Sequence, residues 1–242
     1  MINNIIDFKY NRILMDIPNF DIKSLPSSSM NLIVSKRRAG KSYLTEHLIE
    51  EMKKENRVDV VLLFSGTGAG FQNICEDCRF DNISKLVDVV NNYKTMNDFN
   101  KLHKSKRGKY KIKTTVIIDD LAGELKSKNY KILNNLATNG RHYPYSPLSL
   151  DFFILVQGIT MIPRTMRLNA DTISFTQIPS HKEFNLLTDE CLYLTCTDRE
   201  SKRLALDYYH SIVNEPYAFM CCELYRNNIV YMTDYLKRLK AP

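Results

Sequence analysis

Five short apolar runs recur along the chain, each bounded by polar or turn-forming residues. They are NLIVS (31–35), VDVVLLFSG (58–66), TTVIIDD (114–120), DFFILVQ (151–157) and DTISFTQ (171–177). In the first four runs the apolar residues are consecutive rather than alternating, which indicates strands buried on both faces, as in a parallel sheet covered by helices. Each run is far shorter than the roughly 20 residues that a membrane-spanning helix needs. We therefore expect an α/β fold and no membrane partner.

Helical patterns alternate with these runs, which favours the same fold class. After the first run, residues 41–56 place Leu44, Leu48, Ile49 and Met52 at helical spacing. Further helices are predicted around 83–104, over 130–140 and around 199–213. Residues 217–223 and 228–232 predict a hairpin-like strand pair, followed by a short basic terminal helix.

No linker separates these elements, so we expect a single domain over residues 1–242. It comprises an N-terminal arm or lead-in strand (1–30), a core (31–180) and a small C-terminal hairpin and helix extension (181–242). The sequence starts MINNIIDFKYNR and shows no signal-peptide pattern. We therefore expect an intracellular, non-secreted protein whose six cysteines are reduced thiols.

The first strand runs directly into a candidate phosphate-binding loop, SKRRAGKS (35–42), and then into a helix. The usual pattern is G-x-x-x-x-G-K-[ST], and only its first glycine is replaced, by Ser35. A glycine allows the tight turn, and the helix start offers free backbone N–H groups to an anion. We expect Lys41 to reach the β- and γ-phosphates of ATP and the Ser42 hydroxyl to bind Mg²⁺. The nucleotide-binding residues would be Arg38, Ala39, Gly40, Lys41, Ser42 and Tyr43. The alternative is a basic turn that only opens a helix.

Two acidic residues end the third strand, where ligands of α/β sheets gather. This pattern is a Walker B motif. We expect Asp119 to hold Mg²⁺ and Asp120 to orient or deprotonate the attacking water. Glu124 is the fallback base, and the alternative is that the pair only caps the strand.

Two further polar residues are candidates for a catalytic role. Gln157 ends the fourth strand, where P-loop ATPases with an additional strand place a γ-phosphate sensor. Arg141 follows a helix stop at Gly140, and we expect it to act as an arginine finger towards a neighbouring subunit. A surface ion pair is the alternative for Arg141, and Arg164, Arg167 and Arg199 are the fallback fingers.

Together, NLIVSKRRAGKS, VVLLFSGTG, TTVIIDD and NGRHYPYS followed by FFILVQ resemble the FtsK–HerA superfamily. Within it they resemble the poxvirus-type genome-packaging ATPases of large DNA viruses and virophages, over roughly residues 30 to 180. Ser35 and Asp120 depart from that pattern, which has glycine and, in many relatives, glutamate. The resemblance implies a P-loop NTPase of the additional-strand type, with a mostly parallel central sheet flanked by helices.

The same resemblance implies the function. It predicts an ATPase that translocates double-stranded DNA into a capsid, working as a homo-oligomeric ring with the hexamer as the expected form. A capsid or portal-like protein would dock this ring. The location would then be the host cytoplasm, a viral factory or the virion.

Charge agrees with an anionic partner, since the chain carries a net charge of +7 and has a pI of 9.0. Residues 101–113 hold six lysines, one arginine and no acid, which suits DNA phosphates or a solvated loop equally. Cys75 and Cys78 form a CxxC pair, for which reduced thiols are favoured over zinc. Two other functions remain open: a nucleoside or nucleotide kinase, and a non-enzymatic DNA-binding capsid or adaptor protein with a decayed P-loop.

Overall fold

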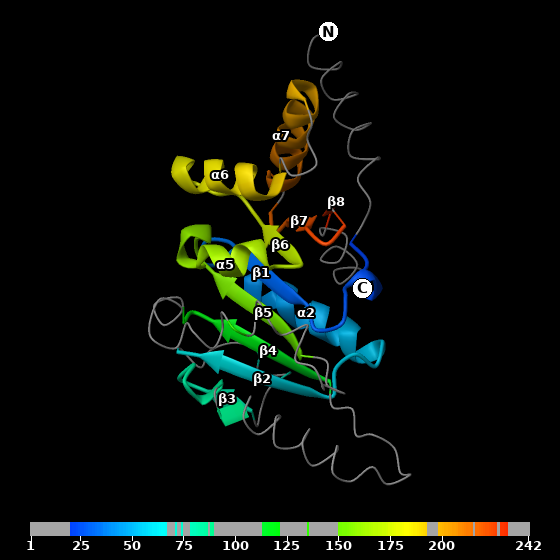
Figure 1. Ribbon diagram of the computed structural model, residues 1–242, viewed down its shortest axis with the longest axis vertical. Coiled ribbons are helices and arrows are strands. Elements are labelled where there is room, and N and C mark those ends of the chain that lie inside the picture. Colours follow the sequence, from blue (N-terminus) through cyan, green and yellow to red (C-terminus); the bar gives the residue numbers. More distant parts are fainter. Residues whose placement is uncertain are drawn as a thin grey trace.

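The computed structural model describes residues 20–66, 71, 74, 78–86, 88–89, 113–121, 135, 150–192, 198–214, 216–226 and 228–231 (Figure 1). Within these residues, eight strands form one sheet in the order β3-β2-β4-β5-β1-β6-β7-β8. The strands are β1 (Met30–Val34), β2 (Val60–Ser65), β3 (Arg79–Phe80), β4 (Thr114–Asp119), β5 (Leu150–Val156), β6 (Thr172–Phe175), β7 (Met220–Glu223) and β8 (Asn228–Tyr231). The first six in this spatial order are parallel, and β7 and β8 add an antiparallel pair at one edge.

The strand that carries the acidic pair is separated from the phosphate-loop strand by β5, which confirms the additional-strand topology. Val34 pairs with Val156 and with Phe175, and Asp119 pairs with Leu155. The carboxyl ends of β4, β5, β1 and β6 therefore meet at one edge of the sheet, which is where α/β folds bind their ligands.

Consecutive apolar residues on each strand divide between two cores, because successive side chains point to opposite faces. On β1, Leu32 belongs to one cluster and Ile33 to the other. Helix α2 (Lys41–Lys54) covers the Ile33 face with Leu44, Leu48, Ile49 and Met52. This burial on both faces confirms the interpretation of the apolar runs.

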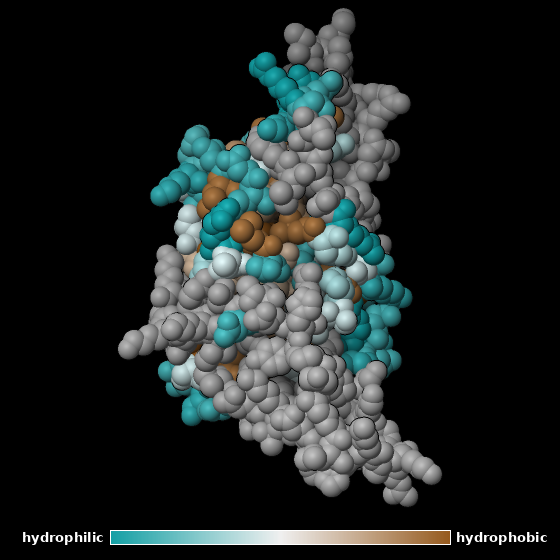
Figure 2. All heavy atoms as spheres, in the orientation of Figure 1, coloured by the Kyte–Doolittle hydropathy of each residue, from teal (hydrophilic) through white to brown (hydrophobic). Residues whose placement is uncertain are grey.

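The opposite face is covered by elements that follow β5. They are the 3-10 turn η4 (Ile159–Met161), α5 (Arg164–Leu168), α6 (His181–Leu187), the π-helical turn η5 (Thr188–Leu192) and α7 (Arg199–Val213). Helix α7 begins with a capping box between Asp198 and Ser201. Figure 2 shows hydrophilic side chains on the outer surfaces of α6 and α7 and apolar ones between these helices and the sheet.

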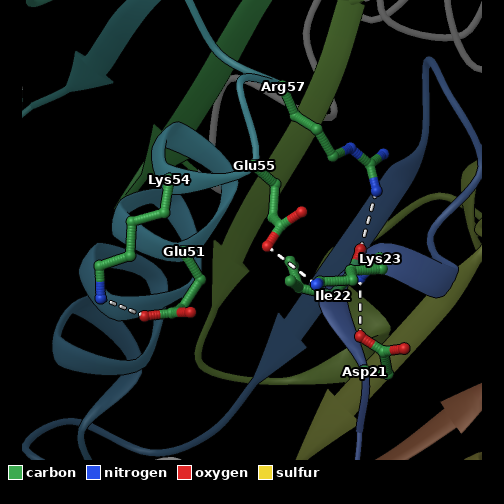
Figure 3. A network of polar contacts seen from close by, with 7 residues as sticks. All are labelled: Asp21, Ile22, Lys23, Glu51, Lys54, Glu55 and Arg57. Carbon is green, nitrogen blue, oxygen red and sulfur yellow. Dashed lines mark hydrogen bonds and ion pairs between the residues drawn. The ribbon is translucent and has the colours of Figure 1, made fainter.

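The segment before β1 is held against the end of α2 rather than adding a strand to the sheet. It forms the 3-10 turn η1 (Ile22–Ser24), whose Ile22 carbonyl accepts a hydrogen bond of 2.7 Å from Arg57. Lys23 pairs with Glu55 at 3.1 Å (Figure 3). The N-terminal strand considered from the sequence is therefore absent from residues 20–29, because this segment is anchored by side chains of the α2–β2 connection.

Buried polar residues fix the register of the central strands at their amino ends. The Asp151 carboxylate accepts hydrogen bonds of 2.8 Å from the backbone N–H and the hydroxyl of Ser29. The Asp171 carboxylate accepts one of 2.8 Å from the Met30 backbone N–H. Because an unpaired buried polar group is costly, these contacts favour one alignment of β5, β1 and β6.

The described cysteines, Cys78, Cys191, Cys221 and Cys222, are free thiols, and Cys75 lies outside the described residues. Among the residues that the structure describes, no helix combines the length and apolar character needed to cross a bilayer. Most of residues 83–104, and all of the predicted C-terminal helix, fall outside those residues. Only Asn135 of the predicted 130–140 helix is described, and it is helical.

Candidate functional site: a phosphate loop facing two carboxylates

The loop from Ser35 to Gly40 joins β1 to α2 at the carboxyl edge of the sheet. Gly40 is the N-cap of α2 and has a φ of 93°, a conformation that side chains with a Cβ rarely adopt. A Cβ on Gly40 would also lie 3.2 Å from Cδ1 of Tyr217. Glycine is therefore needed here for both backbone conformation and space, as the motif predicted.

Ser35 replaces the first glycine of the motif without adopting a left-handed conformation, since its φ is not positive. Its backbone N–H donates to the Val156 carbonyl at 3.1 Å, and its hydroxyl accepts from Thr176 Oγ1 at 3.0 Å. The serine side chain is thus buried and hydrogen-bonded between β1 and β6. The substitution is compatible with this loop conformation.

Lys41 is the first residue of α2, and its side chain folds back along the loop. Its Nζ donates to the carbonyl oxygens of Ser35 at 2.7 Å and Lys36 at 3.1 Å. Only 8% of the residue is exposed. Burial lowers the pKa of Lys41, and the charges of Asp119 and Asp120 oppose that shift. The ammonium group thus lies within electrostatic reach of both carboxylates.

The two aspartates differ in environment, as expected for adjacent residues at a strand end. Asp119 is buried at the end of β4, and burial, followed by the charge of Asp120, raises its pKa to about 6. Asp120 is exposed and has a φ of 56°. Positive φ in a non-glycine residue costs about 1–3 kcal/mol and is found disproportionately at functional sites.

Gln157, the residue after β5, meets the acidic pair across the neighbouring strand end. Its side-chain Nε2 donates to Asp120 Oδ1 at 3.2 Å. The sequence placed both residues at strand ends without showing that they touch. The contact follows from β4 and β5 being adjacent and in register.

These elements enclose a cavity of ≈ 330 Å³ over the loop. Its lining residues are Arg37, Arg38, Gly40, Lys41, Ser42, Tyr43, Asp119, Asp120 and Tyr217. Ala39 belongs to the loop but is not part of this lining. The Ser42 hydroxyl and the Asp119 carboxylate are hard oxygen donors facing one cavity, and Mg²⁺ is usually bound by one or two such groups plus phosphate oxygens. The donor set therefore fits Mg²⁺. The described residues hold no preformed cluster of three or more acidic, histidine or cysteine ligands.

Other candidate residues lie elsewhere. Arg141, Glu124 and the basic stretch up to residue 112 fall outside the described residues. Among the alternative candidates for the arginine finger, Arg167 is buried and donates hydrogen bonds of 2.6 and 2.9 Å to Glu190. It is therefore not available to reach a neighbouring subunit. Arg164 and Arg199 are exposed.

Sequence reasoning missed two features at this edge. Tyr217, from the loop before β7, lines the cavity, although nothing in the sequence links it to a loop far earlier in the chain. Glu183 lies over Gly158, where a Cβ would overlap its Oε1. The Glu183 carboxylate also accepts from Thr160 Oγ1 at 2.6 Å. The glycine after Gln157 was the one available signal for such a close approach.

No protein-family model matches the sequence, and no curated protein matches it. Solved structures do match. The DNA-packaging ATPase B204 of Sulfolobus turreted icosahedral virus superposes with a TM-score of 0.55 at 16% identity, over 86% of this chain and 98% of B204. The genome-packaging NTPase B204 of Sulfolobus turreted icosahedral virus 2, in complex with AMPPCP, gives the same values. The pCW3 conjugation coupling protein TcpA, with ATPγS, matches with a TM-score of 0.54 at 13% identity, over 88% of this chain and 66% of TcpA.

The structure is similar to those of FtsK–HerA-type ATPases. At the level of the fold, this similarity confirms the resemblance and the mostly parallel α/β fold class that the sequence predicted. The hairpin predicted as a C-terminal extension instead continues the central sheet as its antiparallel edge pair. At these identities the similarity concerns the fold.

Proposed function

We propose that this chain is a Mg²⁺-dependent ATPase that drives double-stranded DNA into a viral capsid. One observation carries the ATPase part: Lys41, Ser42, Asp119 and Asp120 line a single cavity, and Gln157 is hydrogen-bonded to Asp120 at its edge. Burial of the Lys41 ammonium group opposite two carboxylates carries a desolvation cost, which a role in binding phosphate would explain.

Phosphate binding would be the work of the loop and of Lys41. The start of α2 offers backbone N–H groups and the positive end of the helix dipole to an anion. Lys41 now satisfies its ammonium group with two loop carbonyls. It would exchange them for phosphate oxygens, which carry full negative charge and bind an ammonium more strongly.

A metal ion would be held by the Ser42 hydroxyl and the Asp119 carboxylate. When bound, Mg²⁺ supplies positive charge that neutralises the oxygens of the β- and γ-phosphates. Asp119 must be ionised to act as a ligand, and its raised pKa places that ionisation at about pH 6. At neutral pH the carboxylate is therefore available to a cation.

Hydrolysis requires a water molecule aligned with the γ-phosphate. The Asp120 carboxylate is exposed at the cavity and can accept a hydrogen bond from that water. It would take the proton as the water oxygen bonds to the γ-phosphorus and the bridging bond to the β-phosphate breaks, so that ADP leaves and inorganic phosphate forms. The Gln157 amide fixes one oxygen of this carboxylate. Because an amide both donates and accepts, Gln157 can also respond to the presence of the γ-phosphate.

Double-stranded DNA is the proposed substrate of translocation. The chain has a net charge of +7 and a pI of 9.0, and the structures it resembles include two B204 packaging proteins. Within the described residues, the start of α7 presents Arg199, Lys202 and Arg203 around one open cavity. These cations and the 101–113 stretch are the candidate contacts to phosphates, whose binding is driven largely by counterion release.

Ring assembly and a capsid or portal-like docking protein complete the proposal. In a ring, Arg141 would reach the γ-phosphate of the neighbouring subunit. Arg141→Ala and Lys41→Ala chains should then each be inactive alone and regain hydrolysis when mixed, because an intact loop can face an intact arginine. Mixed oligomers that form without regaining activity would reassign Arg141 to an ion pair.

One assay separates the proposal from a kinase and from an adaptor. Phosphate release is measured with and without double-stranded DNA, alongside transfer of labelled phosphate to nucleosides and nucleotides. The proposal predicts phosphate release stimulated by DNA, and ATP-dependent displacement of a third strand from a DNA triplex. Transfer to nucleosides would indicate the kinase, and DNA binding without phosphate release would indicate the adaptor.

A further inference from the structure

Tyr217 occupies a position that core packing does not explain. It lies three residues before β7, whose first residue, Met220, pairs with Phe175 at the end of β6. This places Tyr217 at the carboxyl edge of the sheet, beside the phosphate loop. Its ring lies close to Gly40. The residue is nevertheless 55% exposed, and it lines the cavity over the phosphate loop.

The backbone of Tyr217 is unfavourable for an aromatic residue. Its φ is 61°, in the left-handed region that glycine and asparagine occupy more readily. A ring held there at a conformational cost, and only half covered by protein, indicates a use at the cavity rather than in the core.

The arrangement of the cavity determines which end of it would hold the γ-phosphate and which end would hold the nucleoside. The reacting end of the triphosphate must lie near Asp120 and Gln157, which follow β4 and β5. In the sheet order, β1 and β6 separate those strands from β7, so Tyr217 lies on the opposite side of the phosphate loop. The nucleoside end must therefore point away from Asp120, towards the side of the cavity where Tyr217 lies.

We propose that Tyr217 stacks on the base of the bound nucleotide and thereby makes the site prefer a nucleoside triphosphate to bare polyphosphate. The inference rests on the proposed nucleotide site and assigns it a base-binding residue from the C-terminal part of the chain. Stacking of this kind does not select among the bases, since every base presents a π-face to an aromatic ring.

The test compares two ligands that share the phosphates and differ in the base. Binding of ATP and of inorganic tripolyphosphate, each with Mg²⁺, is measured by calorimetry for the wild-type chain, Tyr217→Ala and Tyr217→Phe. Loss of one stacked base contact should weaken ATP binding by about 5- to 150-fold in Tyr217→Ala. Tripolyphosphate should bind all three chains within about twofold, and Tyr217→Phe should bind ATP like the wild type.

A spectroscopic measurement gives a second readout. The chain contains no tryptophan, so Tyr217→Trp introduces a single reporter. ATP should change its emission, whereas tripolyphosphate should leave it unchanged. Tyr217→Asn suits the left-handed backbone, and it replaces the alanine variant if that chain fails to fold.

Equal weakening of ATP and tripolyphosphate in Tyr217→Ala would overturn the inference, because the ring would then only support the phosphate loop. ATP binding that is unchanged in the variant would overturn it as well. Either result leaves the proposed ATPase standing. A wild-type chain that binds neither ligand would refute the nucleotide site itself, and the inference with it.

Discussion

Replacing Asp120 by asparagine removes one negative charge and changes almost nothing else at the site. Asparagine retains an oxygen that can accept the 3.2 Å hydrogen bond from Gln157 Nε2. It also tolerates the left-handed backbone at residue 120, where φ is 56°. The variant should therefore fold normally, which makes its kinetic effect interpretable.

The expected effects on rate and on metal binding have opposite signs. A carboxylate that takes a proton in the transition state contributes about 10²- to 10⁴-fold to the rate, so hydrolysis should fall by at least about 10²-fold. The charge of Asp120 is also one cause of the raised pKa of Asp119. Its removal should lower that pKa, so that Mg²⁺-dependent ATP binding is retained and extends to lower pH.

The assay pairs steady-state phosphate release with calorimetric titration of a non-hydrolysable ATP analogue between pH 5 and 8. Asp120→Glu is the matched control, since it keeps the charge and should retain far more activity than Asp120→Asn. If Asp120→Asn lost binding and rate to the same extent, Asp120 would be a metal ligand or a structural residue and its role as the base would be wrong.

Three further predictions concern the phosphate loop, a buried ion pair outside the site, and the pH dependence of metal binding. Gly40→Ala should lower the free energy of unfolding by about 1–3 kcal/mol, because its φ of 93° disfavours a Cβ, and should weaken ATP binding; thermal denaturation and calorimetry measure both. Arg167→Ala should lower the free energy of unfolding by about 3–5 kcal/mol, because it leaves Glu190 unpaired in a largely buried position. As the control, replacing the exposed Arg164 by alanine should change the free energy of unfolding by no more than about 0.5 kcal/mol in urea denaturation. Equal losses in the two variants would mean that the ion pair is unimportant. Burial raises the pKa of Asp119 to about 6, so protons compete with Mg²⁺ for this carboxylate below that pH. Metal-dependent ATP affinity should therefore rise up to about pH 6 and level off above it. An affinity that is flat across this range contradicts the assignment of Asp119 as a Mg²⁺ ligand.

The same pKa has a consequence for folding. The pKa of Asp119 is higher in the folded chain than its ordinary value of 3.8. The protonated carboxyl therefore favours the folded state below about pH 4, and that contribution is lost as the pH rises through about 6. Asp119→Asn should flatten this part of the stability–pH profile.

Strands and helices with a strong local pattern could be predicted from the sequence. The helix at 199–213 was predicted with the bounds that α7 has, and the five buried strands were placed to within about two residues at each end. Shorter elements were missed. β3 has two residues and α5 has five, and so few residues cannot show a period.

At the site, the local part was predictable and the tertiary part was not. The loop and the acidic pair are defined by consecutive residues and strand ends, so their presence at one edge followed from the parallel sheet. Tyr217 meets Gly40 only because β7 turns back antiparallel beside β6. Neither its positive φ nor this contact leaves a trace in the sequence around it.

The central claim, that the loop at 35–42 binds and hydrolyses ATP to act on DNA, is tested most directly by Lys41→Ala. Phosphate release is measured with saturating ATP, with and without double-stranded DNA, for the wild-type chain and this variant. Lys53→Ala, an exposed lysine in the last turn of the same helix, is the matched control. The account predicts DNA-stimulated release by the wild type and by Lys53→Ala, and release at the background rate by a folded Lys41→Ala chain. Equal turnover by Lys41→Ala and the wild type would contradict it.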